Sequence, residues 1–119
     1  MKSRSYLYGV KSEILVRNYF ESKEFKCLGN RVKTPFGELD LIVKKENLIV
    51  FAEVKARKNL KHFEIITNRQ IIRNSEAANF YLSNNQIFDK YDTRFDLIVV
   101  IGNIIREHIE NAWEYTPTT

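Results

Sequence analysis

The sequence contains little of what builds a disulfide, a thiolate metal site or a membrane span. Cys27 is the only cysteine, which excludes an internal disulfide and a cysteine-rich zinc site. The two histidines, His62 and His108, are far apart, so a His/Cys metal cluster is not expected. No apolar run approaches the length that crosses a bilayer, and the first ten residues lack the apolar stretch of a signal peptide. We therefore expect a reduced, cytoplasmic protein without membrane contact.

Length and composition predict one ordinary globular domain. The chain has 119 residues, of which 44% are hydrophobic and 29% charged, and it contains no repeat or low-complexity segment. We expect a single domain over residues 1–119, with residues 116–119 as a disordered tail. The net charge of +4 is compatible with a polyanionic partner but does not identify one.

Hydrophobic periodicity predicts two helices and five strands. We expect helices over residues 5–23 and 65–83, and strands over residues 25–32, 39–43, 48–54, 94–101 and 104–109. The second helix carries a capping box, in which Thr67 caps and Gln70 reaches back. The order α-β-β-β-α-β-β predicts an α/β domain with a mixed, α+β-type sheet.

The stretch from Gly37 to Arg57 has charged residues inside apolar runs. Two β-branched runs joined by the polar residues 44–47 predict a β-hairpin. If all four polar residues form the loop, Val43 lies opposite Leu48. Asp40 then lies opposite Phe51, with Glu53 as its diagonal neighbour on the same face. A slip of one residue would separate the two carboxylates onto opposite faces.

Two carboxylates on one face could hold a divalent metal ion. With so few histidines and cysteines, the ligands would be oxygens, which favours Mg²⁺ or Mn²⁺. Asp40, Glu53 and the backbone carbonyl of Val54 are candidate ligands. Lys55 would act on an attacking water or on the charged transition state of phosphodiester hydrolysis. Glu13, near the apolar line of the first helix, could add a ligand or orient a water.

Basic residues follow the candidate site along the chain. Arg57, Lys58 and Lys61 come directly after Lys55, and they could contact neighbouring phosphates. Arg69, Gln70 and Arg73 near the start of the second helix are further candidates for contacts with nucleic acid, and the two arginines lie four apart and therefore on one side of that helix. The simplest alternative is that all of these charges form a solvated surface.

Structural explanations compete with each of these roles. A Glu-x-Lys pattern also occurs on exposed strands, and a glutamate at position 13 is more often solvated than buried. Asp96 lies in a setting similar to that of Asp40, and a simple pairing with Arg94 is the structural explanation for it. We expect Trp113 to pack in the interior.

Asp followed by Glu-x-Lys on the next strand resembles the core of the PD-(D/E)xK nuclease superfamily. The chain resembles more closely the YraN-like family of predicted endonucleases, which are related to Holliday junction resolvases. The segments that carry this resemblance span nearly the whole chain: Gly9 with Glu13, Gly37–Ile42, Val50–Arg57, Arg94–Asp96, His108–Ile109 and Asn111–Ala112.

The resemblance implies a restriction-endonuclease-like core and a metal-dependent endonuclease that hydrolyses DNA, duplex or branched, with Mg²⁺ or Mn²⁺. It implies that Glu13, Asp40, Glu53 and Lys55 are the active-site residues, and it leaves a homodimer open. The sequence departs from the pattern in two places. The nearest proline to Asp40 is Pro35, and Arg69 or Gln70 stands where relatives often carry a lysine. The alternatives are a catalytically inactive nucleic-acid-binding module and a protein-interaction domain.

Overall fold

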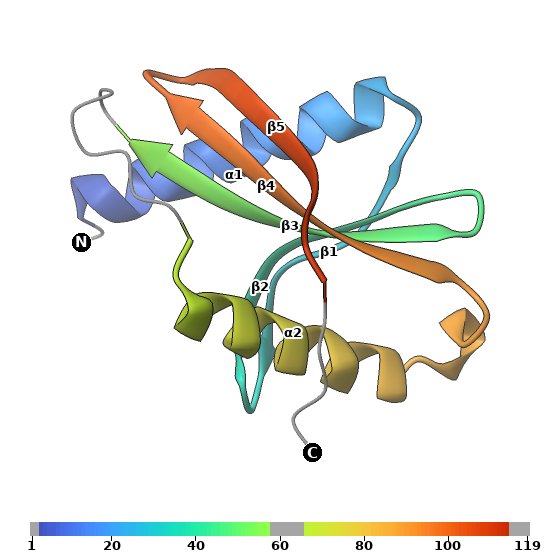
Figure 1. The fold of residues 1–119 in the computed structure, drawn as a ribbon. Coiled ribbons are helices and arrows are strands. Elements are labelled where there is room, and N and C mark those ends of the chain that lie inside the picture. The colour runs from blue at the N-terminus through green and yellow to red at the C-terminus, as the bar shows by residue number, and fades with distance from the viewer. Residues whose placement is uncertain (1–2, 58–65, 115–119) are drawn as a thin grey trace.

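Residues 3–57 and 66–114 are described by the computed structural model, which has one five-stranded sheet with a helix on each face (Figure 1). The elements are α1 (Arg4–Ser22), β1 (Lys26–Thr34), β2 (Gly37–Lys45), β3 (Leu48–Arg57), α2 (Asn68–Ser83), the 3₁₀ turn η2 (Gln86–Phe88), β4 (Asp92–Ile101) and β5 (Ile104–Trp113). The predicted order and the α/β class are confirmed, and the arrangement is consistent with a restriction-endonuclease-like core. Lys58, Lys61 and the tail predicted at 116–119 lie outside the described residues.

The strands lie in the sheet in the order of the sequence, β1-β2-β3-β4-β5. Neighbouring strands are antiparallel except β3 and β4, which are parallel. A parallel pair requires a crossover connection, and α2 lies in that connection. Every residue of β4 from Phe95 to Ile101 is buried.

The β2–β3 hairpin has a tighter turn than the sequence suggested. Lys45 pairs with Leu48 and Ile42 with Phe51, so only residues 46 and 47 form the loop. The expected pairing of Val43 with Leu48 and of Asp40 with Phe51 is wrong. Glu46 adopts a φ of 54°, the conformation that a two-residue turn favours. Ile42, and not Asp40, lies opposite Phe51, so the register differs from the expected one by an even number of residues. Each side chain therefore lies on the face of the sheet on which it was expected.

The two helices cover opposite faces of the sheet (Figure 1). On one face, Ala77 and Ala78 of α2 belong to a buried cluster with Phe51 and Phe95. On the other face, a second cluster joins Val16 and Phe20 of α1 to sheet residues that include Val50, Ala52 and Ile98. Because side chains alternate along β3, Glu53 and Lys55 lie on the α2 side.

Local hydrogen bonds fix where the helices begin. The Ser3 side chain accepts from the N–H of Tyr6 at the start of α1. Thr67 and Gln70 form the predicted capping box, so α2 begins at Asn68 and not at residue 65. β5 continues to Trp113, beyond the predicted end at residue 109, because irregular pairing absorbs extra residues and places Trp113 opposite Phe95. No helix within residues 3–57 and 66–114 is long and apolar enough to cross a membrane.

Candidate metal-binding active site

Asp40 lies where strands β2 and β3 separate. The pairing of the two strands ends at Leu41 and Ala52, the residues next to Asp40 and Glu53. Beyond that point the Asp40 Oδ2 atom accepts a hydrogen bond of 3.0 Å from the backbone N–H of Val54. The side chain thus replaces a ladder hydrogen bond, and this fixes the carboxyl group beside β3.

Glu53 is held from three directions. Its carboxyl group shares a hydrogen bond with that of Asp40. Its Oε1 atom lies 3.6 Å from Lys55 Nζ, and its Oε2 atom accepts from the Asn74 amide of α2 at 3.3 Å. The side chains of Glu53 and Lys55 are only 16% and 15% exposed. The four groups therefore form one buried polar cluster between β2, β3 and α2.

Asp40, Glu53 and Asn74 line a small recess of about 10 Å³, which we call the carboxylate recess. Leu39, Leu41, Phe51, Ala52, Phe95 and Trp113 complete its walls. A space of this size holds about one water molecule. The recess is therefore shaped for a single small species bound directly by the carboxyl oxygens.

Burial raises the pKa of both carboxyl groups. For Asp40 burial is the largest effect, and the Val54 N–H and the Lys55 charge lower its pKa in opposition. For Glu53 burial and the charge of Asp40 raise the pKa to about 8, against the opposing charge of Lys55. Two carboxylates that share a site cannot both ionise easily, so the pair retains a proton at neutral pH.

Glu13 lies apart from this recess. It projects from α1 toward β1, where Arg31 Nε and the Glu13 Oε1 atom are 2.8 Å apart. Burial and then the charge of Asp40 raise the pKa of Glu13, and Arg31 opposes both effects. Glu13 therefore senses the charge of Asp40 but is engaged by an arginine. Among the described residues, no three His, Cys, Asp or Glu side chains gather as a metal-ligand set.

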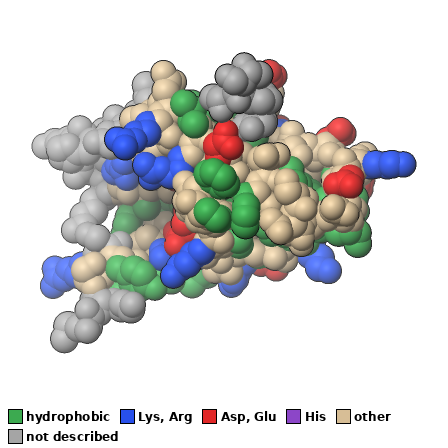
Figure 2. All heavy atoms as spheres, turned by 90° about the horizontal axis from the view of Figure 1, so that it is seen from below, with side chains coloured by type: hydrophobic (Ala, Val, Ile, Leu, Met, Phe, Trp, Pro, Cys, Tyr) green, Lys and Arg blue, Asp and Glu red, His purple; other side chains and the backbone are tan. Residues whose placement is uncertain are grey.

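The basic residues predicted to bind DNA lie in different settings. Arg69 and Arg73 are exposed on the first turns of α2, whereas the Gln70 side chain is used in the capping box. Arg57 ends β3, and its backbone carbonyl accepts from the Tyr8 hydroxyl at 2.7 Å. Figure 2 shows several Lys and Arg side chains gathered toward the side of the molecule on which α2 begins.

Asp96 belongs to a different polar network, on the α1 face. Its fully buried carboxylate accepts two hydrogen bonds from Arg94, both 2.8 Å long, which confirms the pairing considered from the sequence. His108 of β5 lies 2.7 Å from the same carboxylate, and its other ring nitrogen lies 2.7 Å from the Tyr19 hydroxyl of α1. This network ties α1, β4 and β5 together, remote from the α2 face that carries Glu53.

Sequence reasoning missed Asn74 and Arg31. Asn74 is 8% exposed and lies between Ile71 and Ala78 on the apolar stripe of α2. A polar residue on such a stripe is the signal that could have identified it, because a buried amide requires a partner. Arg31 has a φ of 50° within β1, and no local sequence signal points to its contact with Glu13.

Comparison with known proteins places the chain among close relatives. The model of "Uncharacterised protein family UPF0102" matches residues 12–100, a span that includes Glu13, Asp40, Glu53 and Lys55. A UPF0102 protein of Rhodopseudomonas palustris is 34% identical over 92% of this chain and 85% of its own length. A UPF0102 protein of Mesorhizobium japonicum is 34% identical over 94% of this chain and 90% of its own length. A UPF0102 protein of Shewanella denitrificans is 37% identical over 79% of this chain and 88% of its own length.

Proposed function

The chain belongs to the uncharacterised protein family UPF0102, and we propose that it is a divalent-metal-dependent endonuclease that hydrolyses DNA phosphodiester bonds. The observation that carries this proposal is the buried pair Asp40 and Glu53 with Lys55 beside it. A structural role alone does not explain two adjacent carboxyl groups whose charged forms are both disfavoured by burial. The resemblance of the same residues to PD-(D/E)xK nucleases supports it.

The residues of the carboxylate recess fit a hard divalent cation. Carboxylate oxygens are preferred ligands of Mg²⁺ and Mn²⁺, and a cation would offset the charge that burial and mutual repulsion disfavour. Asp40 and Glu53 would hold it, together with the backbone carbonyl of Val54. A bound ion would lower the pKa of an attacking water and neutralise charge on the phosphate. Because the pair of carboxyl groups retains a proton at neutral pH, metal binding would release that proton.

The neighbouring side chains would orient and stabilise. Lys55 would place its ammonium group where negative charge develops on the phosphate, or would hold the attacking water. Asn74 would fix the rotamer of Glu53 through its amide, and the Val54 N–H does the same for Asp40. Glu13 lies further from the recess, and its pairing with Arg31 suits it to shaping the electrostatic field near Asp40.

DNA would approach over the start of α2. Arg69 and Arg73 are exposed there, and Arg57 ends the strand that carries Glu53 and Lys55. Contacts of this kind position the backbone of a nucleic acid without reading its sequence. Branched or junction DNA is included among the proposed substrates through the resemblance to junction resolvases.

A nucleic-acid-binding module without catalysis is the second candidate. The observation in its favour is that Glu13, one of the four residues implied by the resemblance, pairs with Arg31 outside the carboxylate recess. Such a module would bind DNA with the same salt dependence, but it would leave the DNA intact.

A cleavage assay separates the two candidates. Purified protein is incubated with Mn²⁺ or Mg²⁺ and with duplex, single-stranded and four-way-junction DNA. The variant Asp40→Asn removes one proposed ligand, and Asp92→Asn, at an exposed position at the start of β4, is the matched control. We expect metal-dependent cleavage by the wild type and Asp92→Asn only. Binding without cleavage by the wild type on every substrate would instead identify the non-catalytic module.

A further inference from the structure

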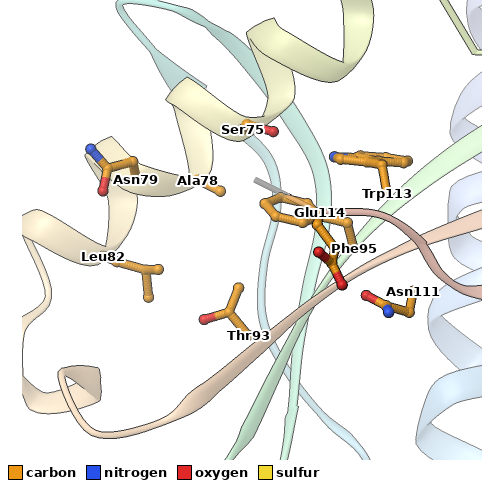
Figure 3. Close-up of a pocket in the computed structure, with 9 residues that line it drawn as sticks. All are labelled: Ser75, Ala78, Asn79, Leu82, Thr93, Phe95, Asn111, Trp113 and Glu114. Carbon is orange, nitrogen blue, oxygen red and sulfur yellow. The ribbon is translucent and has the colours of Figure 1, made fainter. Parts of the chain in front are cut away.

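A second and larger cavity adjoins the carboxylate recess, and we call it the side cavity. It has a volume of about 450 Å³ and lies between α2 and the strands β4 and β5 (Figure 3). Ser75, Ala78 and Leu82 line it from the helix, and Phe95, Trp113 and Glu114 from the other side. Its volume lies within the range of about 300–1,000 Å³ that small-molecule sites occupy.

Two polar atoms at this cavity are buried without a partner. The Ser75 hydroxyl oxygen and the Trp113 indole nitrogen Nε1 make no hydrogen bond among the described residues. Ser75 is 3% exposed and Trp113 is 8% exposed, so neither residue has much access to bulk water. In Figure 3 the two side chains extend toward one another from α2 and from β5. Buried polar groups are normally satisfied, so these two atoms are exceptions within residues 3–57 and 66–114, and a ligand could satisfy them.

The side cavity and the carboxylate recess share a wall. Phe95 and Trp113 line both, and their rings are stacked with centroids 5.3 Å apart and an interplanar angle of 21°. Ser75 follows Asn74 directly on α2, and Asn74 holds Glu53. A ligand in the side cavity therefore lies next to the proposed reaction site, separated from it by one layer of aromatic rings.

The chemistry of the lining favours a neutral, flat heteroaromatic ligand over an anion. None of the described residues that line the cavity is a lysine or an arginine, and Glu114 adds a carboxylate to its lining. A phosphate group would find no positive charge there. Apolar walls beside the Ser75 hydroxyl, the Trp113 indole N–H and the side chains of Asn79 and Asn111 match a nucleobase, which is apolar on its faces and polar on its edge.

We propose that the side cavity receives an unpaired nucleobase of the DNA substrate. This inference rests on the proposed nuclease function and narrows its substrate class. The edge of the base hydrogen-bonds to Ser75 and Trp113, and the adjoining phosphodiester lies toward Asp40 and Glu53. Because leaving the base stack costs free energy in a paired duplex, DNA with a bulged, branched or single-stranded nucleotide binds best.

Binding in EDTA tests this proposal without any cleavage step. Fluorescence anisotropy compares three labelled probes of one sequence: a perfect duplex, a duplex with a one-base bulge, and the same duplex with an abasic nucleotide at the bulge. The last two differ only in the base. We expect the wild type to prefer the bulged base over the abasic bulge by roughly 5- to 100-fold, as stacking and edge contacts of one base contribute.

Two variants each remove one of the unpartnered groups. Ser75→Ala deletes the hydroxyl, and Trp113→Phe deletes the indole N–H while retaining an aromatic ring. Each should reduce the preference for the base roughly 2- to 10-fold, the contribution of one hydrogen bond. Ser12→Ala is the matched control, because the Ser12 hydroxyl is also buried and has no partner in the described part of the chain, but it lies on α1, on the opposite face. It should keep the full preference.

Equal binding of the base and abasic bulges by the wild type would overturn the proposal, as would an unchanged preference in Ser75→Ala. If only a variant truncated after Glu114 prefers the bulged base over the abasic bulge, the side cavity belongs to the C-terminal residues of the full chain, and the proposal is also overturned. These outcomes are independent of catalysis. A base preference without cleavage would refute the nuclease function and retain the base site, whereas cleavage without a base preference would do the reverse.

Discussion

Replacing Glu53 with Gln should remove a pH dependence from the stability of the protein. Glu53 has a pKa of about 8 in the folded protein, raised from 4.5 by burial and by Asp40. Between these two values the folded state binds a proton that the unfolded state has released. The free energy of unfolding must therefore decrease as the pH rises through this window, and its contribution is complete only below pH 4.5. Glutamine resembles the protonated carboxyl group and does not titrate.

The size of the effect follows from the size of the shift. Each pKa unit corresponds to about 1.4 kcal/mol. A rise of the pKa from 4.5 to about 8 reduces the free energy of unfolding by an amount on the order of 4 kcal/mol as the pH increases between those two values. This is a large part of the total stability of an ordinary domain, which is roughly 5–15 kcal/mol. Relative to Glu53→Gln, the wild type should thus be most stable in acid and least stable near pH 8.

Urea unfolding at a series of pH values in EDTA measures this difference. Glu107→Gln, an exposed position on β5, is the matched control and should follow the wild type. Adding Mn²⁺ should restore the stability of the wild type near pH 8 more than that of Glu53→Gln, because a cation replaces the lost proton. If the difference between wild type and Glu53→Gln is constant from pH 5 to 8, the buried carboxyl pair does not titrate as the structure implies.

Further substitutions test the cluster, the second network and the DNA surface. Lys55→Ala should lower single-turnover cleavage ~10²–10³-fold, the effect of one preorganised donor, while DNA binding at equal pH stays unchanged. Asn74→Ala frees the carboxyl group that it holds, and calorimetry should show Mn²⁺ affinity reduced roughly 10- to 100-fold. Asp96→Ala removes the buried carboxylate that Arg94 and His108 share, and urea unfolding should show the free energy of unfolding reduced by roughly 3–5 kcal/mol. In the double variant Arg69→Ala/Arg73→Ala, the plot of log DNA affinity against log salt concentration should become less steep, by about one unit of slope for each lost phosphate contact.

Local patterns predicted the elements because their causes are local. The capping box at Thr67 fixed the start of α2 through contacts within one turn, and the apolar run ending at Ile101 identified the strand β4. The hairpin turn was placed less well, since four consecutive polar residues do not reveal which two make the turn. In the structure the positive φ of Glu46 marks the turn, but nothing in the sequence indicates that this glutamate adopts a positive φ.

The alternation of side chains along the strands was enough to predict which residues of the candidate site share a face. Asp40 and Glu53 share a face in any register that differs by an even number of residues, so their proximity survived the wrong pairing. Contacts between distant elements were not predictable. The Asn74 amide meets Glu53 only because α2 packs over β3, and the indole of Trp113 reaches the side cavity only because β5 extends past residue 109. Both depend on tertiary packing that periodicity does not encode.

Irregular pairing at both outer strands has a consequence for self-association. β1 gains one residue on β2 between Cys27 and Gly29, and β5 departs from regular pairing with β4 at two places. An interrupted outer strand is a poor template for another chain, because its free N–H and C=O groups no longer form a continuous row. We therefore expect the sheet not to extend from one molecule to the next. If the chain forms homodimers, chemical cross-linking should map to helix faces, and cross-links along β1 or β5 would show that the bulges do not protect these edges.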